Sequence, residues 1–215
     1  MNFDVIIVGA GLSGSYLARR IKKLGLNTLI IEKSKGIGGR FSTKPVGREI
    51  ADYGCQYLKP KTKELSKLIQ SLENKNLIKK SSILQDDEAF IAPYGMNKIP
   101  QYLSLGVSTL LNQKVYSIKK TSNQWEIKTN SFFLKSKILV LTMPINQVSE
   151  LLKVSNLAIP DLPTANYKSF YTITFQNMDA IGSKPVLKND FAPWICNNLL
   201  KGLSIDQNTF TANIN

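Results

Sequence analysis

The stretch "FDVIIVGAGLSGSYLARRIKKLGLNTLIIEK", residues 3–33, decides the fold. It opens with a short β-branched run that ends at a glycine turn, which is typical of a buried parallel strand. Apolar residues at helical spacing follow and stop at Gly25. A second apolar run, residues 26–33, then carries the acidic Glu32 near its end. The order strand, helix, strand predicts a βαβ unit of about 30 residues.

The turn between the first strand and the helix has the G-x-G-x-x-G spacing of a dinucleotide-binding fingerprint. Its glycines permit a tight turn, a close approach of the backbone to a pyrophosphate, and close packing of the helix on the strand. The start of the helix offers N–H groups to phosphate oxygens. Glu32 is placed to accept hydrogen bonds from an adenosine ribose, and its charge disfavours the 2′-phosphate of NADP. The residues predicted to contact the dinucleotide here are Gly9, Ala10, Gly11, Leu12, Ser13, Gly14, Glu32 and Lys33.

A second glycine-rich segment, "KSKGIGGRFST", residues 33–43, follows the second strand at once. A simple NAD dehydrogenase has no need of glycines there. Gly39 permits a close main-chain approach, and Arg40 offers a two-pronged contact to phosphate oxygens. An ordinary surface turn is the alternative interpretation. Two glycine loops in close succession favour one long dinucleotide held on both sides.

Several segments resemble a known family of flavoproteins. "GIGGR", residues 36–40, resembles the second phosphate-side loop of the amine oxidase superfamily, in which the arginine contacts the FAD pyrophosphate. "ADYGCQYLKP", residues 51–60, and "FIAPYGMNKIPQYLS", residues 90–104, are similar to segments of the renalase group within that superfamily. The resemblance implies FAD as the cofactor, Gln56 and Tyr57 near the flavin, and the backbone of Val115 facing the adenine.

For Val115 and for Trp194, a purely structural role is the alternative to contact with the cofactor or substrate. Val115 fits equally well as a simple core valine. Trp194 is a candidate to line the flavin or substrate pocket together with Tyr57, and plain packing is the alternative for Trp194.

The expected fold is therefore α/β: a Rossmann-like FAD-binding domain with an inserted α+β substrate domain. We expect residues 1–58 and 95–150 to form the FAD-binding domain and residues 59–94 and 151–215 the substrate domain. Members of the superfamily are longer and return late in the chain to the FAD-binding domain with a Gly-Asp segment. This chain stops at "NTFTANIN", inside an expected strand, so we expect the C-terminal part to be missing and the substrate domain to be incomplete.

The resemblance implies an FAD-dependent oxidoreductase of renalase-like type. In such proteins the flavin accepts a hydride from a small reduced donor, such as a dihydronicotinamide isomer, and passes the electrons to oxygen. An amine or amino-acid oxidase is one alternative, and a non-catalytic truncated dinucleotide-binding fragment is another. The chain has no histidine, which excludes Ser-His-Asp triads and most zinc hydrolase designs. No catalytic residue is predicted, because the flavin carries the chemistry.

Composition limits the partners. The net charge of +13 comes mainly from lysine, since four of the 28 basic residues are arginine. The lysines occupy the polar faces of expected helices, as in residues 59–80, so a solvated surface is expected rather than a nucleic-acid site. No apolar run approaches the roughly 18 residues of a membrane span. Cys55 and Cys196 lie far apart, which favours a reducing cytoplasm and no metal site.

Overall fold

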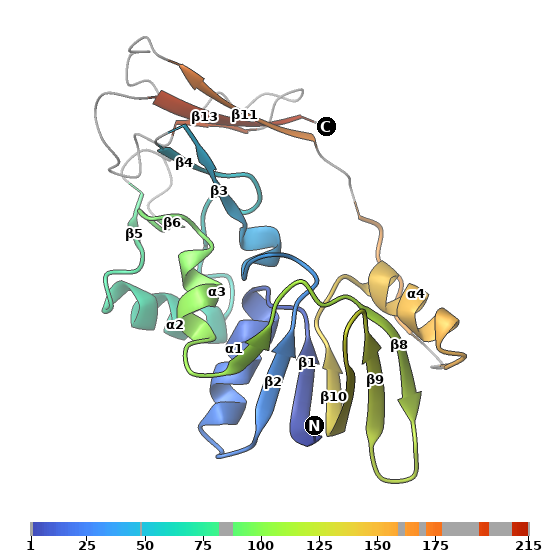
Figure 1. Cartoon of the computed structure of the whole chain (residues 1–215). Coiled ribbons are helices and arrows are strands. Elements are labelled where there is room, and N and C mark those ends of the chain that lie inside the picture. The colour runs from blue at the N-terminus through green and yellow to red at the C-terminus, as the bar shows by residue number, and fades with distance from the viewer. Residues whose placement is uncertain are drawn as a thin grey trace. The chain divides into compact units, whose positions relative to one another are not determined.

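The computed structural model shows two compact units, each built from two parts of the chain (Figure 1). The first unit is Met1–Gly39 with Pro100–Tyr167, and the second is Arg40–Ile99 with Lys168–Asn215. This is a division by compactness, so the predicted division into FAD-binding and substrate domains stays a prediction. The residues that the structure describes are 2–47, 49–81, 88–158, 162–167, 171–177, 194–197 and 208–214.

The first unit is built on a six-stranded mixed sheet with the strand order β7-β2-β1-β10-β9-β8. The first four strands in this order are parallel, and β9 and β8 continue the sheet in antiparallel fashion. Val8 is in register with Ile31 and Leu141, so β1, β2 and β10 end at one level. The bounds are β1 Asn2–Val8, β2 Thr28–Ile31, β7 Ser108–Leu110, β8 Val115–Lys120, β9 Trp125–Thr129 and β10 Phe133–Leu141.

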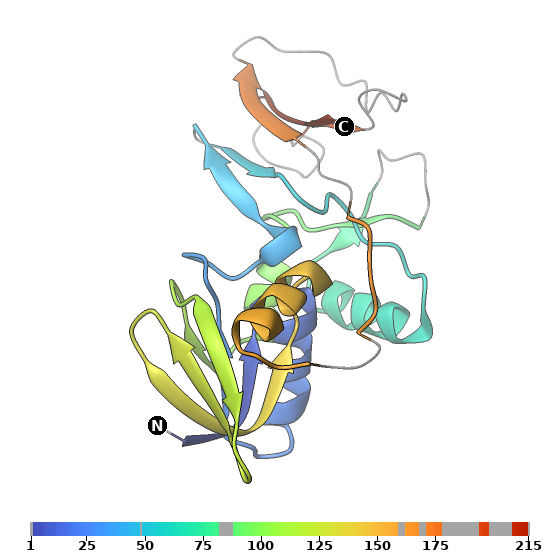
Figure 2. The same cartoon turned by 90° about the vertical axis from the view of Figure 1, so that its right-hand side faces the viewer.

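Both faces of the central strand β1 are buried, which is why its sequence is a continuous apolar run. Val5 and Ile7 pack with Ala18 of helix α1, Leu12–Lys22. Ile6 and Val8 face the other way and belong to the cluster that includes helix α4, Ile145–Val154. The two helices can be followed beside the strands in Figures 1 and 2. Successive side chains of a strand point to opposite faces of the sheet, so β1 contributes to two hydrophobic clusters, one on each face.

The predicted elements of this unit are confirmed. Residues 3–33 form strand, helix and strand as predicted, and residues 115–129 add the antiparallel pair β8 and β9 to the sheet. Pro144 follows β10, the last parallel strand, and is the N-cap of α4. The α/β fold class with a parallel sheet is therefore confirmed.

In its described residues, the second unit contains short paired strands and the helix α2. In helix α2, Lys63–Glu73, the Thr62 side chain accepts a hydrogen bond from the Leu65 N–H, and Ile69 and Leu72 are buried. This helix is shorter than the lysine-rich segment 59–80 in which it was predicted. The strands pair as β3 Thr43–Val46 with β4 Glu49–Asp52, β5 Lys79–Lys80 with β6 Phe90–Ile91, and β13 Asn208–Ile214 with both β11 Tyr171–Asn177 and β12 Trp194–Asn197.

Two short helices lie where the chain passes between the units: the 3-10 turn Gly39–Phe41 and α3, Lys98–Leu103.

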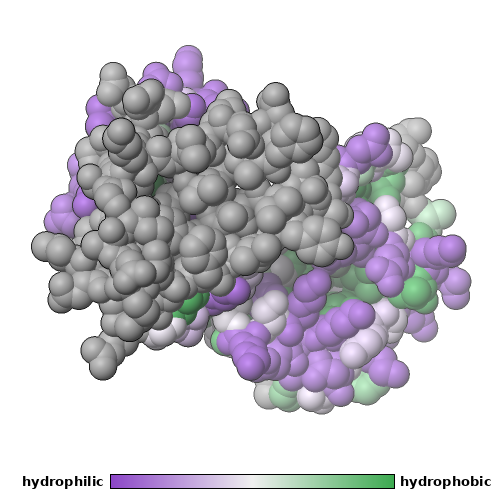
Figure 3. Space-filling model, turned by 90° about the horizontal axis from the view of Figure 1, so that it is seen from above, coloured by the Kyte–Doolittle hydropathy of each residue, from purple (hydrophilic) through white to green (hydrophobic). Residues whose placement is uncertain are grey.

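The coloured surface in Figure 3 is mostly hydrophilic, with small separate apolar patches. Within the described parts of the chain, no helix is long and apolar enough to cross a membrane. The same residues contain no group of three or more acidic, cysteine or histidine side chains that could hold a metal ion.

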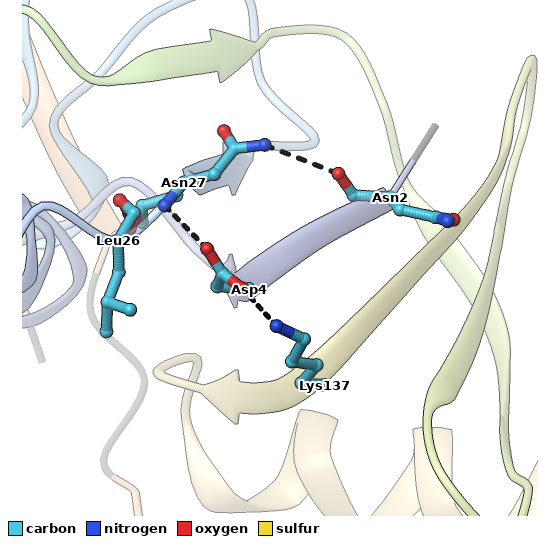
Figure 4. Close-up of polar contacts among 6 residues, drawn as sticks. Asn2, Asp4, Leu26, Asn27 and Lys137 are labelled. Atoms are coloured by element: carbon cyan, nitrogen blue, oxygen red, sulfur yellow. Dashed lines mark hydrogen bonds and ion pairs between the residues drawn. The ribbon is translucent and has the colours of Figure 1, made fainter.

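Polar contacts tie the beginning of β1 to its neighbours (Figure 4). The Asn27 N–H donates to Asp4 Oδ2 at 3.0 Å, and Lys137 Nζ donates to Asp4 Oδ1 at 2.8 Å. Asn27 Nδ2 donates to the carbonyl oxygen of Asn2 at 3.3 Å. The hydrogen bond from Lys137, followed by that from the Asn27 backbone, lowers the pKa of Asp4 below its usual value of 3.8. Asp4 therefore joins β1 to β10 and to the residue that precedes β2.

We expect an Asp4→Asn variant to unfold at a slightly lower temperature than the wild type at pH 7 and at low salt. The amide oxygen can still accept the Asn27 N–H, so the change removes the charge and the hydrogen bond from Lys137 and keeps the bond from Asn27. Because the pKa of Asp4 is lowered on folding, its contribution is present above about pH 4 and is lost as the pH falls through the folded-state pKa. Thermal unfolding of both proteins from pH 7 to pH 2 measures this. A difference that is unchanged at pH 2 would contradict the assignment.

Candidate dinucleotide-binding site

The first glycine turn is tightly constrained by its own backbone. Gly9 has a φ of +107°, and its N–H donates to the Ile31 carbonyl at 2.8 Å. The Thr142 hydroxyl donates to the Gly9 carbonyl at 3.1 Å from the end of β10. A Cβ atom on Gly14 would lie 2.0 Å from the Gly9 carbonyl oxygen. The start of α1 therefore reaches this close to the strand only because residue 14 has no side chain.

The second glycine loop packs directly on the first. The Gly38 N–H donates to the Ala10 carbonyl at 3.0 Å, and Gly11 and Gly38 form a parallel bridge. Gly39 has a φ of +57°, and a Cβ atom there would lie 3.1 Å from Gly11 Cα. The contact between the loops alone is a sufficient reason for glycine at 39, independently of any ligand. Contact of Gly39 with phosphate stays a prediction.

Glu32 joins the two loops. The residue is only 7% exposed. The Ala10 N–H donates to Oε2 and the Ser34 N–H donates to Oε1, each at 2.8 Å. Each carboxylate oxygen has a second acceptor site, so the group can still accept hydrogen bonds from ribose hydroxyls.

A pocket of about 270 Å³ opens at the carboxyl ends of β1, β2 and β10, where ligands of open α/β sheets bind. Four predicted residues lie on its wall: Gly9, Glu32, Lys33 and Val115. Val115 is also 8% exposed and part of the hydrophobic core, so both interpretations of this residue agree with its position. The remaining lining residues are Val8, Ile31, Gln113, Lys114, Tyr116, Met143, Gln147, Glu150, Leu151 and Val154.

The predicted phosphate contacts of the first loop lie at the start of α1. Gly11 is the N-cap and has an extended backbone, with no side-chain capping hydrogen bond. Ala10 is buried and Ser13 is exposed. The first turn of the helix carries no acidic residue, so its positive end is not neutralised from within.

The other predicted residues belong to the second unit. Arg40 has an exposed side chain, and its carbonyl accepts the Cys55 N–H at 2.7 Å. Gln56 is buried, its Nε2 donates to the Asp52 carbonyl, and its Oε1 has no hydrogen-bond partner among the described residues. Lys59 Nζ lies 5.7 Å from the centre of the Tyr57 ring. The roles of Arg40, Gln56 and Tyr57 in binding stay predictions.

Two further positions singled out in the sequence belong to this unit. The side chain of Trp194 lies outside what the structure describes. Burial raises the pKa of the Cys55 thiol, and a backbone hydrogen bond with Tyr57 opposes this only in part, so Cys55 is not poised as a nucleophile.

The pocket has polar residues that sequence reasoning did not single out. Gln113 and Lys114 precede β8, and Gln147 and Glu150 project from α4. The sequence does contain a signal that could have indicated Gln147 and Glu150. Pro144 marks the end of a parallel strand at the ligand-binding edge, so polar residues in the next helical turn were reasonable candidates. The position of β8 beside this edge depends on sheet pairing and has no local signal.

Comparisons with known proteins agree with this geometry. Residues 7–72 match the family model described as an NAD(P)-binding Rossmann-like domain. The chain is 33% identical to putrescine oxidase of Kocuria rosea over 69 residues, which are 32% of this chain and 14% of that protein. It is 33% identical to a flavin-containing amine oxidase of Oncorhynchus mykiss over 67 residues, 31% of this chain and 13% of that protein. The matches to curated relatives such as these thus span only a small part of the relatives' length.

The whole chain is also similar to solved structures. Wild-type putrescine oxidase bound to putrescine superimposes with a TM-score of 0.73 at 12% identity, covering 100% of this chain and 76% of that one. The fold is Rossmann-like. At this level of identity the structural likeness shows the fold and nothing further.

We expect a Gly14→Ala variant to lower the free energy of unfolding by about 1–3 kcal/mol or more, because the new methyl group meets a backbone oxygen that cannot move aside. Gly36→Ala is the matched control, since nothing lies within 4 Å of a Cβ atom there. That control is expected to be neutral or slightly stabilising. Urea unfolding of the two variants measures the difference, and equal stabilities would contradict the described packing of α1 on β1.

Proposed function

We propose that this chain is an FAD-dependent oxidoreductase whose first unit binds the adenosine diphosphate half of FAD. The observation that carries the proposal is the buried Glu32 carboxylate. It lies on the pocket wall and is hydrogen-bonded to both glycine loops. A carboxylate at this position suits ribose hydroxyls and repels a 2′-phosphate, which argues against NADP.

The residues present fit such a ligand. A side chain at Gly14 or Gly39 would collide with the neighbouring loop backbone, so the surface beside the start of α1 stays free of side chains at these points. Oriented N–H groups at the helix start favour a pyrophosphate there. Arg40 follows the second loop directly and supplies a positive charge that a simple dinucleotide turn lacks. The flavin-containing relatives support FAD over NAD.

Within this proposal the chain's residues bind and orient. Glu32 accepts the ribose hydroxyls, the first turn of α1 holds the phosphates, and the apolar wall around Val115 excludes water from the base. A phosphate contact of Arg40 is what the family resemblance implies. FAD, when bound, supplies hydride acceptance and transfer of electrons to oxygen.

The substrate is a small reduced molecule. Two classes of substrate are candidates, an amine and a dihydronicotinamide isomer, and each rests on a different observation. The names of the relatives, putrescine oxidase and flavin-containing amine oxidase, favour an amine. The segments at residues 51–60 and 90–104 favour the renalase-like class, which acts on dihydronicotinamide isomers. Anaerobic addition of each donor to the FAD-loaded chain distinguishes them, because only a true donor bleaches the flavin absorbance.

The central test is FAD binding by the purified chain. We expect retention of a yellow flavin absorbance after dialysis against buffer, and an FAD affinity about 10- to 100-fold weaker in Glu32→Gln, which loses the charge that ribose hydroxyls bond to. Glu126→Gln is the matched control, since Glu126 pairs with Lys135 on the surface away from the pocket. Because Glu32 also bonds to both loops, thermal unfolding of each variant is measured in parallel.

A folded wild-type chain that takes up no added FAD would refute this proposal. That result would support the interpretation of the chain as a non-catalytic dinucleotide-binding fragment. Equal FAD affinity in Glu32→Gln and wild type would refute the role of Glu32 alone.

A further inference from the structure

One side-chain hydrogen bond crosses the pocket. Lys33 Nζ, just beyond the end of β2, donates to Gln147 Oε1 on helix α4 at 3.2 Å. Both residues line the pocket, and they come from segments 114 residues apart. The ammonium can only donate, so the oxygen of the Gln147 amide is held on the side of Lys33.

Of the two glutamine amides on the pocket wall, that of Gln147 retains the capacity to bond to a ligand. Both polar atoms of the Gln113 amide already have partners. Its Oε1 accepts a hydrogen bond from the Thr129 hydroxyl at 2.9 Å, and its Nε2 donates to Ser131 Oγ at 3.4 Å. Gln147 Nε2, by contrast, has no hydrogen-bond partner among the residues that the structure describes. Its Oε1 also retains a second acceptor site.

The surroundings of this amide suit a flat ring. Val115 and Ile31 lie on the strand side of the pocket, and Met143 and Leu151 come from the end of β10 and from α4. Apolar walls with a small number of oriented polar groups are typical of sites for cofactor rings.

We propose that Gln147 is the residue that reads the purine base of the bound dinucleotide, and that Lys33 fixes the orientation in which it reads. This inference rests on the proposed function, since it requires an adenosine moiety in this pocket. On its Watson–Crick edge adenine presents the N6 amino donor beside the N1 acceptor, which a glutamine amide matches with two hydrogen bonds. Hypoxanthine presents a carbonyl acceptor beside a ring N–H, which is the reverse pattern. A freely rotating amide satisfies either base by turning over, whereas an amide held by Lys33 satisfies only adenine.

The test uses the full chain and measures competition of ADP and of inosine diphosphate against FAD. We expect wild type to bind ADP about 5- to 150-fold more tightly than inosine diphosphate, the range for one good two-bond contact to a base. In Gln147→Leu this preference should fall to about twofold or less, because the hydrogen bonds to either base are lost.

In Lys33→Met the preference for ADP should also fall, because the Gln147 amide can turn over. Inosine diphosphate should then bind as tightly as it does to wild type, or more tightly. Gln70→Leu is the matched control, since Gln70 is exposed on α2 and should leave the preference unchanged.

Different results would refute the proposed function, the role of Gln147 and the role of Lys33. A wild-type chain that binds neither FAD nor ADP refutes the proposed function and this inference with it. A wild-type chain that binds FAD, with the same preference for ADP in Gln147→Leu as in wild type, refutes the role of Gln147 only. Loss of the preference in Gln147→Leu but not in Lys33→Met refutes the orienting role of Lys33.

Discussion

The site depends on one buried carboxylate. Glu32 follows β2 directly, and its two oxygens accept N–H groups from Ala10, after β1, and from Ser34, at the start of the second loop. Both loops are thereby fixed to the same point at the end of the sheet. Burying an ionised carboxylate is costly unless it is hydrogen-bonded, and here the backbone of the two loops meets that requirement. The same group is then positioned to recognise a ribose.

The sheet explains why this point lies where a ligand can reach it. Because β1 is buried on both faces, its side chains are fully used in packing and it can contribute only its end to a site. The registers of β2 and β10 bring their ends to the same edge, and α4 then covers one side of the resulting pocket. Gly9, Glu32 and Gln147, which are distant in sequence, become neighbours around one cavity for this reason.

The parts of the structure that were predictable from the sequence are those set by local periodicity. The βαβ unit, the β8–β9 hairpin and the end of the last parallel strand near Pro144 all follow from short-range patterns. The sequence predicts a phosphate contact for Gly39, and the close approach of Gly11 is a second reason for glycine at this position. The contribution of Gln147 was predictable only in part. Pro144 marks the edge of the sheet at which α4 begins, but which polar residues of α4 face the pocket depends on how the helix packs across the sheet.

The central claim is that the two glycine loops hold one dinucleotide together. Amide hydrogen exchange of the full chain, with and without FAD, tests it most directly. We predict that exchange slows on addition of FAD in both loops, residues 9–14 and 36–40, over the same range of FAD concentration. Slower exchange in the first loop alone, in a chain that binds FAD, would contradict the claim that the second loop takes part.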